Sequence, residues 1–183
     1  MTNTTRSRRT GTLEPMPAGR VHEAINLGAL GLLSASYLYH GDHLGVSEPA
    51  AFGFAAAYLI GTFLVTPDLD LAEQRVRAKG NWGVLGWLWV PYGLIFSHRG
   101  WSHTWIVGPL TRLAYMALMG ALLWFGGEAL LQYLGVQLDL RGQVRLPPGP
   151  VLYSAVAGYF AAQWLHLVAD GIWPDAGFRR ARR

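Results

Sequence analysis

The sequence predicts an all-α membrane protein with about four transmembrane helices and an additional interfacial or re-entrant aromatic segment. Hydrophobic residues make up 51% of the 183-residue chain and charged residues 14%, whereas soluble domains carry roughly 25% charged residues. Four apolar stretches are each close to the roughly 20 residues that a spanning helix requires. Eight tryptophans and eight tyrosines fit the same class, because their rings favour membrane interfaces.

The polar ends of the chain set the expected domain boundaries. Residues 1–18 are expected to be a disordered basic tail, 19–178 a single helical membrane domain with a metal site, and 179–183 a basic C-terminal tail. The chain contains no cysteine, which excludes disulfides, thiolate metal sites and cysteine nucleophiles. Any metal must therefore be bound by imidazole and carboxylate groups.

The expected spans cover residues 21–39, 49–65, 104–134 and 150–173. Thr66-Pro67 closes the second, because a residue before proline disfavours the helical conformation. Pro174 closes the fourth. The alternative is a bundle of buried soluble helices, but the abundance of glycine and alanine with few charges argues against it.

Residues 81–96 lie between the second and third expected spans and are apolar and aromatic. Glycines and a proline interrupt them, so the segment is too short and too broken to span a membrane. We expect an interfacial or re-entrant piece, whose backbone must be satisfied by protein or water. Its rings are expected to form an interfacial belt, made of Trp82, Trp87, Trp89 and Tyr92.

Basic residues are unevenly distributed between the two sides that four spans would create. Twelve of the 15 lysines and arginines lie on the side shared by the N-terminus, the second connection and the C-terminus. Cytoplasmic loops carry such an excess. We therefore expect an integral protein of the bacterial inner-membrane type with both termini in the cytoplasm, and we attribute the positive charge to topology rather than to nucleic-acid binding.

Histidine and aspartate residues gather at the cytoplasmic ends of these spans. The lysines and arginines alone determine this topology, so the clustering is an independent observation. The candidate metal ligands are His22, Asp68, Asp70, His98, His103, His166 and Asp170. Imidazole with carboxylate suits zinc, manganese, iron or nickel. We expect one or two divalent ions, with zinc first and manganese or iron as alternatives; ions in known two-metal sites lie about 3.5–4 Å apart. His40 and His43 lie at the far end of the first span and are left out.

Two local spacings support coordination. His166 and Asp170 are four residues apart on an expected helix, so they share a face. Asp68 and Asp70 are two apart, and in extended geometry both carboxylates point the same way. Structural alternatives stay open: the aspartates could cap a following helix, and His166 could bond to a backbone carbonyl in the core.

Charged neighbours of these ligands are candidates for catalysis. Glu23 is a candidate general base or a partner of a ligand, and the alternative is a solvated carboxylate at a helix start. Arg99 suits an anionic group such as phosphate, because guanidinium binds such groups bidentately. Arg112, inside the third span, suits the same role, or instead pairs with an acid or snorkels.

Five stretches carry a family resemblance. They are Gly19 to Glu23, Pro67 to Asp70, Asn81 to Tyr92, Ser97 to His103, and His166 to Asp170. In this order they resemble an uncharacterised family of metal-binding membrane proteins related to the LexA-regulated (YdjM-like) membrane-bound metal-dependent hydrolases. The resemblance implies metal binding. The His-x-x-x-Asp pair is also similar to the zinc-dependent phospholipase C group, over the ligand pattern alone.

The expected function is metal-dependent hydrolysis of a phosphoester or ester in a lipid-like substrate at the cytoplasmic face. The expected partners are membrane lipids and an anionic, lipid-like or phosphorylated substrate. A non-enzymatic metal-binding or metal-sensing protein stays open and would be favoured by a closed coordination shell. A di-iron lipid oxidase or hydroxylase ranks last, because such enzymes are richer in closely spaced histidine pairs.

Overall fold

The computed structural model describes residues 19–71, 77–96, 100–136 and 146–174, and all regular structure within these ranges is helical. The four expected spans correspond to the long helices α1 (Gly19–Leu44), α2 (Glu48–Phe63), α5 (Val107–Tyr133) and α6 (Gly149–Ala169). Short helices fill the connection between α2 and α5: η1 (Pro67–Asp70), α3 (Arg77–Asn81), η2 (Gly83–Trp89), α4 (Val90–Ile95) and η3 (Trp101–His103). The largest boundary difference is in α1, which continues to Leu44 instead of ending at Tyr39.

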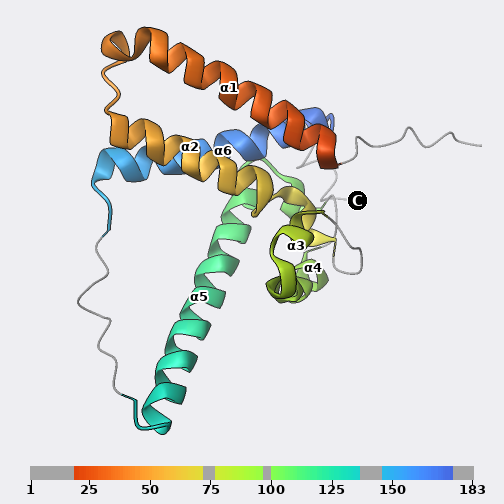
Figure 1. Cartoon of the computed structure of the whole chain (residues 1–183). Coiled ribbons are helices and arrows are strands. Elements are labelled where there is room, and N and C mark those ends of the chain that lie inside the picture. The colour runs from red at the N-terminus through yellow and green to blue at the C-terminus, as the bar shows by residue number, and fades with distance from the viewer. Residues whose placement is uncertain (1–18, 72–76, 97–99, 137–145, 175–183) are drawn as a thin grey trace, which may run out of the picture.

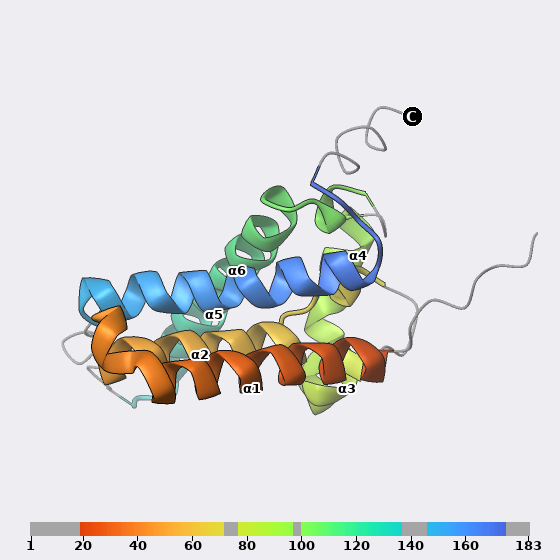
Figure 2. The same ribbon diagram turned by 90° about the horizontal axis from the view of Figure 1, so that it is seen from above.

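Helices α1, α2 and α6 lie side by side, with α3 and α4 near the end where α1 begins (Figures 1 and 2). Of these three helices, α2 and α6 pack together most closely. A Cβ on Gly158 of α6 would lie 2.2 Å from the carbonyl oxygen of Phe54 in α2. Gly45, with φ of 62°, permits the turn that returns the chain from α1 to α2. We refer to α1, α2 and α6 as the three-helix layer.

Helix α5 leaves this layer at a steep angle and is exposed along most of its length (Figure 1). Its first turns are anchored by Arg112, which is fully buried and donates hydrogen bonds of 2.9 Å to the carbonyl of Ser102 and to Oε1 of Gln163 in α6. Gln163 in turn donates to the carbonyl oxygens of Gly61 and Val65 at the end of α2. This network joins α2, α5 and α6.

The aromatic segment over residues 81–96 forms short helices, as expected for a piece that does not span. Trp87 is 67% exposed, in keeping with the expected belt, but Trp89 and Tyr92 are buried against Tyr115 of α5. The belt prediction is therefore wrong for these two residues. The Tyr92 hydroxyl finds a partner inside the protein, the Oγ1 of Thr111 at 2.9 Å, and a satisfied hydroxyl allows tyrosine to be buried.

Three helical stretches are long and apolar enough to cross a membrane: Glu48–Asp70, Val107–Tyr133 and Gly149–Ala169. Helix α1 is long enough but is not among them, so the fourth span stays a prediction. The composition of these helices supports membrane association. The sidedness of the termini stays a prediction as well.

Candidate metal centre

Several elements bring imidazole and carboxylate groups to one end of the three-helix layer. The predicted ligands that the structure describes are His22 in the first turn of α1, Asp68 and Asp70 in η1, His103 in η3, and His166 and Asp170 at the end of α6. Two other predicted site residues, the ligand His98 and the catalytic candidate Arg99, lie outside the described residues. All six described ligands take part in close imidazole–carboxylate contacts.

His22, His166 and Asp170 form the central group, with ligand atoms that all lie within 4.8 Å of one another. Oδ1 of Asp170 lies 3.2 Å from Nε2 of His22, and Oδ2 of Asp170 lies 3.5 Å from Nε2 of His166. The two imidazoles are stacked, with centroids 4.2 Å apart and 13° between their planes. Asp170 follows α6 directly, and its backbone N–H donates to the carbonyl of His166 at 3.0 Å. The helix end therefore fixes both side chains.

Asp68 adds a fourth candidate donor from η1. Its Oδ1 lies 3.6 Å from Nε2 of His166, and its side chain is 27% exposed against 5% for that of His166. Asp68 therefore lies on the accessible side of the group. The extended geometry expected for Asp68 and Asp70 is not found, because both lie in a 3₁₀-helix. With about three residues per turn, positions two apart diverge, and Asp70 contacts His103 instead.

The distances around His166 suit a shared metal ion better than hydrogen bonds. Its Nε2 is buried without a hydrogen-bond partner among the described residues, although two carboxylates lie 3.5 and 3.6 Å away. N–H···O bonds are usually about 2.7–3.2 Å long. Two atoms that bind one tetrahedral zinc, each about 2.1 Å from it, lie about 3.4 Å apart. The residues present therefore fit a divalent ion.

Beside the central group, Asp70, Ser102 and His103 form a second, buried group. Oδ2 of Asp70 accepts hydrogen bonds from Nδ1 of His103 at 2.9 Å and from the Ser102 hydroxyl. With its proton on Nδ1, the neutral imidazole carries its lone pair on Nε2, a usual metal-binding atom. Oδ2 of the predicted ligand Asp70 is thus occupied by two donors, and this contact fixes the ring of His103.

Electrostatics favour an ionised carboxylate at the end of α6. Burial opposes ionisation of Asp170, but its hydrogen bond from His22 and the charges of His166 and His22 outweigh burial and hold its pKa below the ordinary value. Burial lowers the pKa of Lys79, and the negative charge of Asp70 partly opposes that effect. Ionised carboxylate is the form that binds a metal.

Glu23, predicted as a general base, pairs with Arg77 rather than with the described ligands. A carboxylate oxygen lies 2.7 Å from Nε of Arg77, and this ion pair ties the start of α1 to α3. The Glu23 side chain is 13% exposed and that of Arg77 is 48% exposed. The catalytic role of Glu23 stays a prediction.

Sequence reasoning missed Gln163, which is fully buried. The available signal was its position three residues before His166, on the same face of an apolar helix. Arg112 was expected to bind an anion, pair with an acid or snorkel. Instead its guanidinium donates to an amide oxygen and a backbone carbonyl. Arg112 thus holds the backbone of Ser102 in the second group, and Gln163 joins Arg112 to the end of α2.

Comparison with known proteins gives an independent assignment. The model of a family described as "Uncharacterized metal-binding protein (DUF2227)" matches residues 17–180. The chain belongs to this family. A DUF2227 protein is thus expected to bind metal, and the residues around His166 are the donor set that the structure offers for it. The relationship to the YdjM-like hydrolases stays a prediction.

A relative from Aquifex aeolicus (strain VF5), described as an uncharacterized protein, is 38% identical over 63 residues. The match covers 34% of this chain and 43% of that protein, so it spans less than half of the relative. No solved structure matches the chain.

Proposed function

We propose that this DUF2227 protein is a membrane-embedded metal-dependent hydrolase that acts on a phosphoester or ester of a lipid-like substrate at the cytoplasmic face. One observation carries the proposal: the buried Nε2 of His166 lies 3.5 and 3.6 Å from two carboxylates and has no partner at an ordinary hydrogen-bond distance among the described residues. His22, Asp68 and Asp170 complete a set of two imidazoles and two carboxylates. This set suits zinc first, with manganese or iron as alternatives.

A bound divalent metal supplies Lewis acidity and makes water a nucleophile near neutral pH. Access to the site supports hydrolysis, because catalytic metal sites keep an open position, and the partly exposed Asp68 marks one accessible side. His103 is held beside η1, the short helix that carries Asp68, by its contact with Asp70. This position suits a ligand for a second ion or a proton acceptor. Arg99 remains our candidate for binding the anionic part of the substrate.

Non-enzymatic metal binding or sensing is the second candidate function. The observation that favours it is the burial of His22 and His166, each 4% exposed, because structural metal sites are closed to solvent. The two candidates differ in what they require. A hydrolase needs substrate access beside Asp68, whereas a sensor needs access only for the ion.

Elemental analysis of detergent-purified protein tests the metal centre. We expect about one or two equivalents of zinc, manganese or iron per chain, and their loss in His166→Ala and Asp170→Asn, because each variant removes a ligand. His40→Ala is the matched control, because His40 lies near the opposite end of α1. An unchanged metal content in both ligand variants, or a wild type that stays metal-free after reconstitution, would overturn the metal centre.

Hydrolysis is tested on the metal-loaded protein with bis(p-nitrophenyl) phosphate, p-nitrophenyl butyrate and phosphatidylglycerol vesicles. We expect turnover of at least one of these, which a chelator abolishes and added metal restores. Asp170→Asn should be inactive, and His40→Ala should match the wild type. A protein that binds metal but turns over none of the three would favour the sensing function.

A further inference from the structure

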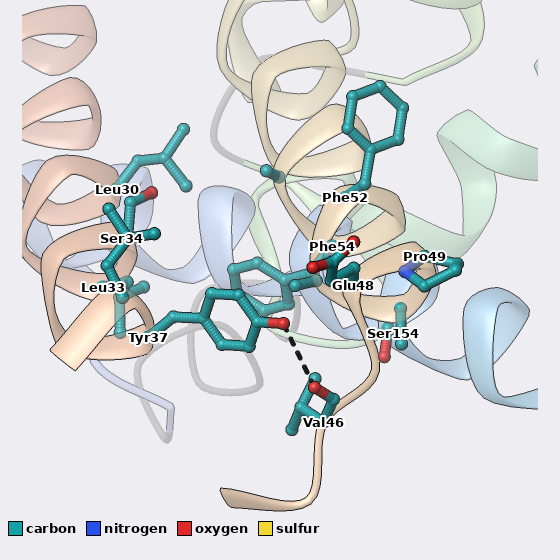
Figure 3. Close-up of a pocket in the computed structure, with 14 residues that line it drawn as sticks. Leu30, Leu33, Ser34, Tyr37, Val46, Glu48, Pro49, Phe52, Phe54 and Ser154 are labelled. Carbon is teal, nitrogen blue, oxygen red and sulfur yellow. Dashed lines mark hydrogen bonds between the residues drawn. The ribbon is translucent and has the colours of Figure 1, made fainter. Parts of the chain in front are cut away.

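A groove of about 790 Å³ opens between α1 and α2, toward the end of the three-helix layer that lies away from the metal centre. Figure 3 shows Leu30, Leu33 and Tyr37 of α1 on one side and Phe54 of α2 on the other. Small residues also line it, among them Ala55 of α2. A trough with small and bulky apolar linings is suited to a thin, flexible ligand.

Two hydrogen bonds hold α1 near the ends of this groove. One helical turn beyond the end nearer the metal centre, the Tyr58 hydroxyl donates to Oδ1 of Asn26 at 2.9 Å. At the other end, the Tyr37 hydroxyl donates to the carbonyl of Val46 at 3.2 Å. The α1 residues that line the groove run from Leu30 to Leu38, over which a helix rises about 12 Å. Half of a hydrocarbon core of about 30 Å is about 15 Å, so the groove covers most of the depth of one leaflet.

The surroundings of the groove identify the kind of molecule that fills it. Its lining includes only two serines, one tyrosine and one glutamate with polar side chains, whereas ordered water needs several polar partners. Empty apolar space forfeits dispersion contacts. Leu38 and Phe52, which also line the groove, are 84% and 76% exposed, and α2 belongs to a stretch apolar enough to span a membrane. In a bilayer, the apolar molecule beside such a surface is a lipid.

We propose that the groove between α1 and α2 binds one acyl chain of a membrane lipid. This proposal rests on the membrane placement proposed above, but it requires neither a bound metal nor hydrolysis. The volume and the apolar lining between two helices distinguish the groove from the later turns of α5, which present apolar side chains along an open helix surface.

Photolabelling in vesicles tests this proposal. The full chain is reconstituted in phosphatidylethanolamine and phosphatidylglycerol with a phosphatidylethanolamine probe that carries a diazirine on one acyl chain, and labelled peptides are mapped by mass spectrometry. We expect labels to concentrate on residues 30–38 and 50–55. Ala55→Trp and Ser34→Leu, which fill the groove from opposite walls, should each reduce this labelling about fivefold, because they occupy the space of the chain. Gly126→Trp on α5 is the control, because Gly126 is exposed and an added Cβ there would meet no other atom.

Three results would overturn the proposal. Labelling spread evenly over all exposed apolar surfaces, α5 included, would mean that the groove retains no lipid. Unchanged labelling in both filled variants would mean the same. A wild type that is a dimer, with filled variants that are monomers and still labelled, would make the groove a contact between two copies. Metal content is measured on the same samples, so loss of the metal centre is distinguished from loss of the groove.

Discussion

His103 and His166 meet their carboxylates at different distances, and the difference separates two roles. Nδ1 of His103 lies 2.9 Å from Oδ2 of Asp70, which is a hydrogen-bond distance. Nε2 of His166 lies 3.5 Å from Asp170 and 3.6 Å from Asp68, beyond ordinary hydrogen bonds. The first contact fixes the orientation of a ring, and the second leaves room for an ion between the atoms.

Replacing Asp70 with asparagine is expected to weaken metal binding without removing a ligand from the central group. The amide lacks the negative charge that fixes His103 and polarises its ring, and loss of such an orienting carboxylate typically costs about 10–100-fold in metal affinity. Competition with a chromophoric zinc chelator measures the change.

The matched control for this variant is Glu23→Gln, which removes only the ion pair with Arg77. We expect its metal affinity to stay within about twofold of wild type, because a partly exposed ion pair contributes little. An Asp70→Asn variant whose affinity equals that of wild type would contradict the orienting role. Complete loss of metal, as in Asp170→Asn, would instead make Asp70 a ligand.

At the scale of elements, the fit between α2 and α6 positions the site, because η1, which carries Asp68, begins four residues after α2 ends, and His166 lies on α6. Gly158 permits this close approach, because a Cβ at that position would collide with the backbone of Phe54. Gly158→Ala is expected to lower the free energy of unfolding by about 2 kcal/mol, because the helices must separate. Far-UV circular dichroism during denaturation in detergent measures it.

The control for this helix contact is Gly120→Ala in α5, where the added methyl group meets no other atom. This change is expected to leave stability unchanged or raise it by up to about 1 kcal/mol, because alanine favours helix over glycine. An equal loss in the free energy of unfolding in both variants would show that the close contact between α2 and α6 is not the cause of the loss.

Gln163 connects α6 to two other elements. Gln163→Leu removes the acceptor of Arg112 and the donor to the Gly61 and Val65 carbonyls. We expect a loss of about 3 kcal/mol in the free energy of unfolding, because Nη2 of the buried Arg112 loses its acceptor and two carbonyl groups lose their donor. Gln132→Leu, on the exposed part of α5, is expected to change it by less than about 0.5 kcal/mol. Denaturation curves of the two variants provide the comparison.

Elements proved easier to predict than contacts between them. Helices α2, α5 and α6 follow apolar stretches of similar length, and a stretch of that composition would satisfy its backbone in an apolar medium only as a helix. The contact of Asp70 with Ser102 crosses 32 residues. It depends on how η1 meets η3, which no local spacing encodes. Burial of Trp89 and Tyr92 likewise depends on where α5 begins, because Tyr115 covers both rings.

For the whole molecule, the absence of cysteine makes the predicted sidedness directly testable. Ser47→Cys lies in the turn between α1 and α2, and Gly80→Cys lies in α3, beyond the other end of α2. In intact bacterial cells, a membrane-impermeant maleimide is expected to label the first variant and not the second, because positive-inside bias places α3 in the cytoplasm. The reverse pattern would invert the topology, and labelling of neither or both would contradict spanning by α2.

The hydrogen bond between Tyr58 and Asn26 has a mechanical consequence, because it holds α1 between the metal centre and the groove. His22 lies one turn before Asn26, about 6 Å along the helix, and Leu38 lies about 18 Å beyond it. The Tyr37 hydroxyl also donates to the carbonyl of Val46, beside Leu38. Helix α1 is therefore tied on both sides of the groove, and the two bonds fix the distance between the groove and His22 along one continuous helix.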